Sequence, residues 1–347
     1  MVGGADERAR ANGSRWSLNM KTLSANRVLS SVLCIAAALA VLWVLVPLGA
    51  RQTTNTSSKA ARASDGVSPR RFDTPQQAAD ALADAAEKFD VRALEEIFGS
   101  EGDDVVLFGE YGQDRERASR FAVEAREKMA ISIDPARGTR AFVLVGNEDW
   151  PFPVPLVKAG TKWVFDANAG RQEMLYRQIG GNELDAIAIC RGYVQAQQEY
   201  ALRKREGYDV HQYAQRIVST PGKQDGLAWQ NQDGSWGGPV GENIARAIEQ
   251  GYTSGAEPYH GYFFKILKGQ GPAAPLGEMD YMVKGLMIGG FALAAVPAEY
   301  GVTGVKSFIV SQDGVVYQKD FGPATLDEFK KMDRYNPDTT WQPVEVE

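Results

Sequence analysis

The residues best suited to catalysis or metal binding are scarce in this 347-residue chain, which contains two histidines and two cysteines. His211 and His260 lie far apart in sequence and form no His-Glu-x-x-His motif, so the sequence predicts no metal site. His260 has the chemistry of a general base, but a single histidine at a strand start is more often a hydrogen-bonded structural residue. We therefore predict no catalytic residue and no cofactor.

Other catalytic signatures are also missing from the sequence. It has no Gly-x-Ser-x-Gly elbow, no P-loop and no Gly-x-Gly-x-x-Gly turn after a strand, which disfavours serine hydrolases, nucleotide hydrolases and dinucleotide-binding enzymes. Glu183, Asp185 and Glu199 lie on or near the polar side of a predicted helix. Paired carboxylates hydrolyse glycosides, so a glycan or peptidoglycan hydrolase remains an alternative, although a solvated helix face is the usual role of such residues.

The clearest binding signal is a group of aromatic residues around a glycine-rich stretch at 226–239. Exposed rings of this kind stack on sugars or dock a protein, whereas buried rings would anchor the stretch as a loop. The predicted ligand-binding residues are Trp229, Trp236, Tyr252, Tyr259 and His260.

One predicted helix, residues 182–201, organises the elements around it. Its apolar residues cover about half of its circumference, so it requires a sheet or other helices against it. Asn182 follows Gly180 and Gly181 and is the predicted N-cap. Cys190 lies on the apolar face and is interpreted as an inert core thiol.

Local patterns predict the remaining elements of an α+β protein. Thr74 with Pro75 and Asp90 mark two helix starts. Further helices are expected at 114–129, 208–218, 242–251 and 325–332, with a C-terminal clasp around Trp341. Strands are expected at 140–145, 152–158, 162–166, 259–267, 280–288, 290–296, 305–311 and 315–319.

The chain divides into five predicted segments. The uncharged residues 28–50 are long enough to cross a bilayer, and basic residues precede them, which predicts a cytoplasmic N-terminus and an exported remainder. A cleaved signal peptide is the alternative. The segments are a cytoplasmic basic segment (1–27), a transmembrane anchor or signal peptide (28–50), a flexible linker (51–70), an α+β domain (71–168) and a helix with a β-meander (169–347).

Charge excludes one class of partner. The formal net charge is −6: residues 1–50 carry five basic and two acidic residues, and the rest of the chain carries 33 basic and 42 acidic ones. No basic patch is available to bind phosphates, so we predict no nucleic-acid partner. Cys190 is the only cysteine after residue 50, so the exported part has no intrachain disulfide.

Several rare aromatic and glycine motifs occur in a characteristic order. They are WPFPVPL (150–156), WVFD (163–166), GGNEL (180–184), AQQEY (196–200), PYHGYFF (258–264), GGFAL (289–293) and GVTG (301–304). From about Phe72 to the C-terminus the chain resembles the bacterial family called domain of unknown function 2950. That resemblance implies an exported protein and no particular chemistry.

The C-terminal half is also similar to the globular heads of type IV pilins and pseudopilins, in which an antiparallel meander wraps one long helix. The chain departs from them because residues 28–50 are not continuous with residue 182 and no pilin processing motif lies near Val28. We expect an inner-membrane protein with its bulk in the periplasm, or a secreted periplasmic one if the signal is cleaved. It would act as a non-catalytic interaction or structural module for an envelope protein or glycan. A pilin-like assembly subunit is the further alternative.

Overall fold

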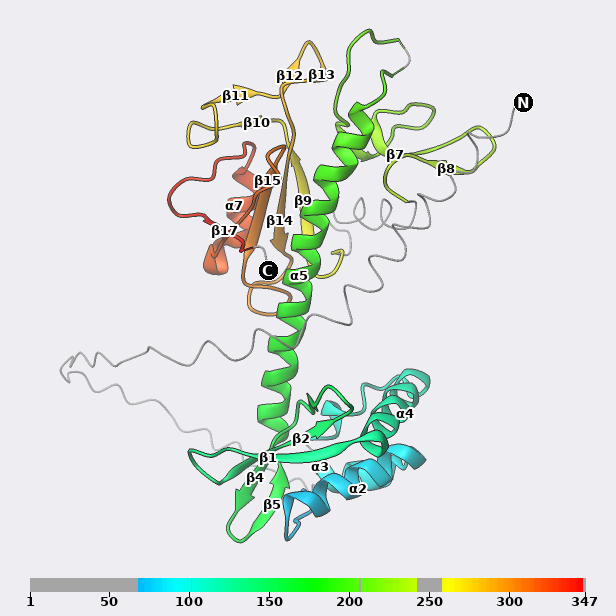
Figure 1. Ribbon diagram of the computed structural model, residues 1–347, viewed down its shortest axis with the longest axis vertical. Helices are drawn as coiled ribbons and strands as arrows, with labels where there is room; N and C mark the ends of the chain where they lie inside the picture. Colours follow the sequence, from blue (N-terminus) through cyan, green and yellow to red (C-terminus); the bar gives the residue numbers. More distant parts are fainter. Residues whose placement is uncertain (1–67, 101, 206, 242–257, 346–347) are drawn as a thin grey trace, which may run out of the picture. The chain divides into compact units, whose positions relative to one another are not determined.

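The computed structural model describes residues 68–345 except 101, 206 and 242–257 (Figure 1). The predicted segments 1–27 and 28–50, nearly all of 51–70, and the predicted helix at 242–251 lie outside the described residues. Within the described part, no helix has both the length and the apolar character needed to cross a membrane. This part is mixed α+β with several antiparallel sheets, which confirms the predicted class.

The first hydrophobic core lies between three helices and a sheet. Thr74 caps α2 (Pro75–Lys88) by accepting from the Gln77 N–H at 3.2 Å, and Asp90 caps α3 (Val91–Phe98) by accepting from Ala93. A 3₁₀ turn, η1 (Asp103–Val105), leads to α4 (Tyr111–Glu127). These caps satisfy amide groups that the first helical turn leaves unpaired, and both predicted starts are confirmed.

The sheet of the first core is antiparallel in the order β1-β2-β4-β5, with β3 paired to β2. Its strands are β1 (Met129–Ile133), β2 (Arg140–Val145), β3 (Trp150–Pro151), β4 (Leu156–Ala159) and β5 (Lys162–Phe165). The strand predicted from 152 begins only at Leu156. Pro153 and Pro155 carry no N–H to donate, so the pairing with β2 is interrupted between β3 and β4.

Helix α5 (Ala167–Ala201) is longer than predicted. Asp166 caps it by accepting from the Ala169 N–H at 3.0 Å, so Gly180 and Gly181 lie inside the helix. The prediction that Asn182 is the N-cap is therefore wrong. The Asn182 side chain instead donates to the Thr303 carbonyl at 2.8 Å, because the intact helix already pairs the backbone around it.

The second core is built on a sheet in the order β17-β16-β15-β14-β9 (Figure 1). Helix α5 packs on β14, β15 and β16, and a short helix, α7 (Thr325–Lys331), packs on β14. The strands are β9 (Tyr262–Leu267), β14 (Ala292–Pro297), β15 (Ser307–Ser311), β16 (Val316–Lys319) and β17 (Gln342–Pro343). Each neighbouring pair is antiparallel, and the strands predicted around β9, β14, β15 and β16 and the helix predicted at 325–332 are confirmed.

Strand register places alternate residues on opposite faces of this sheet. Lys265, Ala294 and Ile309 pair across β9, β14 and β15 and therefore share one face. The Lys265 ammonium donates to the Phe329 carbonyl near the end of α7 at 2.8 Å, so this is the face that α7 covers. Burial lowers the pKa of Lys265. The opposite face carries Phe264 and Phe308 toward α5.

Three sequence predictions between 202 and 288 are wrong. Residues 208–218 form no helix, because buried Gln197 bonds both the N–H and the carbonyl of Ala214, and the Tyr213 N–H donates to Met287. The stretch at 226–239 is a hairpin of β7 (Gly226–Gln230) and β8 (Trp236–Gly237), with β6 (Arg216–Val218) parallel to β7. The single strand predicted at 280–288 is instead divided between two short antiparallel pairs. In the first, β10 (Gly269–Gln270) pairs with β11 (Met279–Asp280), and in the second, β12 (Met282–Val283) pairs with β13 (Leu286–Met287).

The glycine pair inside α5 gives a stability prediction. A Cβ at Gly180 or Gly181 would meet no atom within 4 Å. Gly180→Ala and Gly181→Ala should each raise the free energy of unfolding by about 0.5–1 kcal/mol, because alanine loses less backbone entropy in a helix. Urea titration followed by circular dichroism measures this change.

Gly170, in the same helix, is the matched control. Its Cβ would lie 2.7 Å from a methyl carbon of Val154, so Gly170→Ala should lower stability. If all three variants lost stability, α5 would not be a continuous helix at Gly180.

Cys190 gives a second prediction. It is fully buried, and burial raises the pKa of its thiol to about 12. Because the thiolate is the reactive form, at pH 8 only about one molecule in ten thousand would carry a reactive Cys190. In a Cys34→Ser background, an aromatic disulfide reagent should leave the native protein unmodified and label the urea-unfolded chain completely. Rapid labelling of the native chain would contradict this burial.

Candidate functional site

A pocket of about 180 Å³ lies beside α7 in the described part of the chain. Its walls come from β15, the end of β16, Phe321 just beyond that strand, α7, and the C-terminal segment after that helix. The lining residues are Ile309, Lys319, Phe321, Glu328, Lys331, Met332, Arg334, Asn336 and Trp341.

The lining is rich in hydrogen-bond donors. Lys319, Lys331 and Arg334 are cationic, and Asn336 contributes an amide, while Glu328 is the one carboxylate among the lining residues. None of these nine side chains is a serine, threonine, cysteine or histidine. The pocket therefore has groups that hold an anion and none of the usual hydroxyl, thiol or imidazole groups of a nucleophilic site.

Lys319 is placed by the register of the sheet. Lys319 pairs with Ser307, and Ser307 lies two residues before Ile309 in β15, so both side chains point to the same face of the sheet as Ile309. This is the face that α7 covers. Its ammonium lies 4.6 Å from the centre of the Phe321 ring and 5.8 Å from that of Trp341, and the two rings meet edge to face at 5.5 Å. Aromatic faces attract a cation without neutralising it. Among the described residues, no carboxylate oxygen lies within 4.0 Å of the Lys319 ammonium.

The other two cations already have acidic partners. Lys331 lies 2.9 Å from Glu328, and this hydrogen bond raises the pKa of Lys331. Arg334 lies 2.6 Å from Asp280 and 3.9 Å from Glu278, and the Asp280 hydrogen bond is the main cause of its raised pKa. Lys319 is therefore the cation of the pocket with the least compensated charge.

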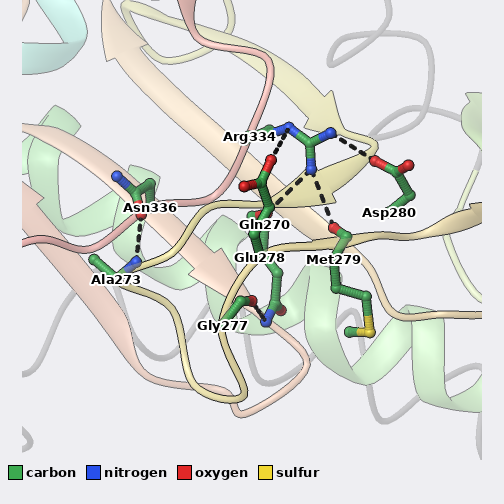
Figure 2. Close-up of polar contacts among 8 residues, drawn as sticks. All are labelled: Gln270, Ala273, Gly277, Glu278, Met279, Asp280, Arg334 and Asn336. Carbon is green, nitrogen blue, oxygen red and sulfur yellow. Dashed lines mark hydrogen bonds and ion pairs between the residues drawn. The ribbon is translucent and has the colours of Figure 1, made fainter.

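Arg334 and Asn336 also bind a neighbouring loop, residues 271–278 (Figure 2). The Arg334 guanidinium donates to the carbonyls of Gln270 at 3.1 Å and Met279 at 3.3 Å, one on each side of the loop. The Asn336 side-chain oxygen accepts from the Ala273 N–H at 2.9 Å, which leaves the amide NH₂ group of Asn336 as a donor. The two residues thus form part of the pocket wall and fix the loop.

The loop is held from inside by Gln270, which is 1% exposed. Its amide nitrogen donates to the carbonyls of Pro275 and Gly277, and its oxygen accepts from the Tyr281 hydroxyl at 2.9 Å. Between these two carbonyls Leu276 is 93% exposed and has a φ of 71°, a conformation that costs a non-glycine residue energy. Internal hydrogen bonds therefore define the shape of this loop.

The two predicted tryptophans lie in the β7–β8 hairpin. Trp229 pairs with Gly237 and Trp236 pairs with Gln230, and both rings are half-buried against the second core. The Arg205 guanidinium lies 5.2 Å from the Trp229 ring centre and 3.8 Å from that of Tyr200. Trp229 thus packs near the end of α5.

Tyr259 and His260 lie elsewhere along α5. His260 Nδ1 is 2.6 Å from a carboxylate oxygen of Asp185, and its ring meets Tyr259 edge to face at 4.4 Å. Asp185 and Tyr200 are separated by about 22 Å along the axis of α5, because each helical residue rises 1.5 Å. Trp229 thus lies near the end of α5, whereas His260 binds an earlier turn of that helix, and Tyr252 lies outside the described residues. Ligand binding by these five residues stays a prediction.

The carboxylates considered for a hydrolase have other contacts. Glu183 accepts from the backbone N–H groups of Val305 and Lys306, both at 2.9 Å, which fixes the turn before β15 to α5. Asp185 binds His260, and Glu199 is exposed on α5. None of the three lines the pocket.

Sequence reasoning missed the pocket because its residues carry no common motif. They are distributed from Ile309 to Trp341 over two strands, a helix and a tail, and only the sheet register and the position of α7 bring them together. The one local signal was the clasp predicted around Trp341, which the contact between Trp341 and Phe321 supports.

The family whose description is "Protein of unknown function (DUF2950)" matches residues 69–344. The chain belongs to this family. The match confirms the resemblance inferred from the motifs, and it includes the pocket and the loop at 271–278 of this DUF2950 protein. No curated protein and no solved structure matches the chain, so its similarity to pilin heads stays a prediction.

The contacts of Arg334 predict a local effect of its removal. Arg334→Gln should increase hydrogen exchange of the amides at 271–278 by roughly tenfold, because two backbone carbonyls and Asp280 lose their donor. Mass spectrometry of peptic fragments measures this. Lys330→Gln is the control, since the Lys330 pair with Asp327 is exposed on α7. Equal protection in Arg334→Gln and wild type would contradict a role for Arg334 in holding the loop.

Proposed function

We propose that this protein is a non-catalytic binding module of the bacterial envelope whose pocket beside α7 takes an acidic group of an envelope protein or glycan. The observation that carries the proposal is the lining itself. Cationic and amide donors surround a cavity in which the only carboxylate, Glu328, is already bound to Lys331. A site with many donors and few free acceptors favours ligands that accept hydrogen bonds, and anions accept most strongly.

The arrangement of carboxylates favours binding over hydrolysis. A glycosidase requires two carboxyl groups facing one bond, one of them with a raised pKa. Glu183 and Asp185 instead hold backbone and histidine partners, and the shifted carboxyl pKa values among the described residues, those of Asp104, Asp233 and Asp338, are all lowered by hydrogen bonds. These carboxylates are suited to structural roles.

The sequence supports the envelope part of the proposal. Residues 28–50 are uncharged, and Arg8, Arg10, Arg15, Lys21 and Arg27 precede them. This asymmetry favours an N-terminus in the cytoplasm and a periplasmic location for the residues after 51. The pocket then faces a compartment that contains acidic peptides and glycans.

A thermal-shift experiment on the full chain in detergent tests anion binding. At constant ionic strength, replacing chloride by acetate should raise the melting temperature, because a ligand bound only to the native state stabilises it. The gain is about 1.4 kcal/mol at ten times the dissociation constant. The shift should disappear in Lys319→Met, which removes the least compensated charge.

Lys330→Met is the matched control, because Lys330 lies on the same helix as Lys331 but outside the lining. It should retain the acetate shift. An equal shift in wild type and Lys319→Met would contradict binding in this pocket and would indicate a general salt effect.

A further inference from the structure

The pocket combines its donors with apolar surface. Ile309, Phe321, Met332 and Trp341 make up four of its nine lining residues. A bare inorganic anion would contact the donors and leave these four side chains facing water. A ligand with an apolar part would also cover them, and the removal of apolar surface from water favours binding.

The charge of the pocket favours a single negative charge on the ligand. Glu328 compensates Lys331, and Asp280 with Glu278 compensates Arg334, which leaves Lys319. The nearby acidic residues are engaged as well. Asp320 lies 3.8 Å from Lys306. Asp338 accepts a hydrogen bond from Thr340, which is the main cause of the lowered pKa of Asp338, and the charge of Lys319 is a minor cause. One uncompensated ammonium matches a monoanion better than a phosphate dianion.

The position of Lys319 determines where the apolar part of such a ligand lies. Its ammonium is within 6 Å of the ring centres of both Phe321 and Trp341. A carboxylate bound to Lys319 thus brings its own substituent to these rings. The volume of about 180 Å³ is below the range of about 300–1,000 Å³ for pockets that enclose drug-sized ligands, so the substituent must be compact.

We propose that the pocket selects a monocarboxylate attached to a compact apolar group, such as an aryl or short acyl carboxylate, free or at the end of a longer molecule. This rests on the proposed function, because it specifies which acidic group the same pocket takes. Lys319 binds the carboxylate, the Asn336 amide donates a second hydrogen bond, and Phe321 and Trp341 contact the apolar group.

Four small probes test this selectivity on the full chain in detergent at pH 8. They are acetate, benzoate, benzyl alcohol and phenyl phosphate, with binding followed by calorimetry. Benzoate should bind at least tenfold more tightly than acetate. Benzyl alcohol, which has the ring without the charge, and phenyl phosphate, which carries two charges, should each bind at least tenfold more weakly than benzoate.

Variants connect the selectivity to the residues. Lys319→Met should weaken benzoate at least tenfold, whereas Lys330→Met should leave its affinity unchanged. Phe321→Leu should reduce the preference for benzoate over acetate to less than threefold, and Trp341→Leu gives a second measure of the same contact. Circular dichroism selects the variants that keep the native fold.

The outcomes separate this inference from the proposed function. If acetate and benzoate bind equally and Lys319→Met loses both, the pocket binds anions as proposed but the apolar selectivity is overturned. If benzyl alcohol or phenyl phosphate binds as tightly as benzoate, the monocarboxylate requirement is overturned. If no anion binds, the proposed function fails and this inference fails with it.

Discussion

Burial of the central strands between two helices is the constraint on which the second half of the structure depends. Every residue of β14 and β15 is buried. Three of the six β14 residues are alanines, Ala292, Ala294 and Ala295, whose small side chains allow α5 and α7 to pack closely. Because α7 is only seven residues long, it covers only part of this face of the sheet, and the C-terminal segment covers another part. The pocket forms where β15, β16 and α7 meet that segment.

Much of this fold could be predicted because its signals are local. Thr74 and Asp90 cap their helices within three residues, and the alternation in β2 follows from a strand with one face in the core. The start of α5 could not be placed in this way. Gly180, Gly181 and Asn182 have the composition of a helix boundary, yet the helix formed from Asp166 onward continues through them, and only the contact of Asn182 with Thr303 explains that asparagine.

The candidate site was much less predictable, because its properties arise from contacts distant in sequence. Lys319 is an ordinary lysine at the end of a polar hairpin strand until register places it against Phe321 and Trp341. Trp229 and Trp236 attracted attention by residue type, but their half-buried hairpin packs near the end of α5. Residue type thus pointed to the tryptophans. Charge compensation, which requires knowledge of the partners of each cation, instead distinguishes Lys319 among the cations of the pocket.

The division of tasks among the three cations follows from their hydrogen bonds. Arg334 donates to two backbone carbonyls and to Asp280, so an anion that recruited it would have to compete with partners that hold the loop at 271–278. Leaving those part-buried carbonyls unpaired would cost free energy. In the part of the chain that the structure describes, the Lys319 ammonium lies near the Phe321 and Trp341 rings and forms no ion pair, so it can accept a carboxylate without breaking one. The same tail segment can therefore stabilise the fold through Arg334 and leave recognition to Lys319.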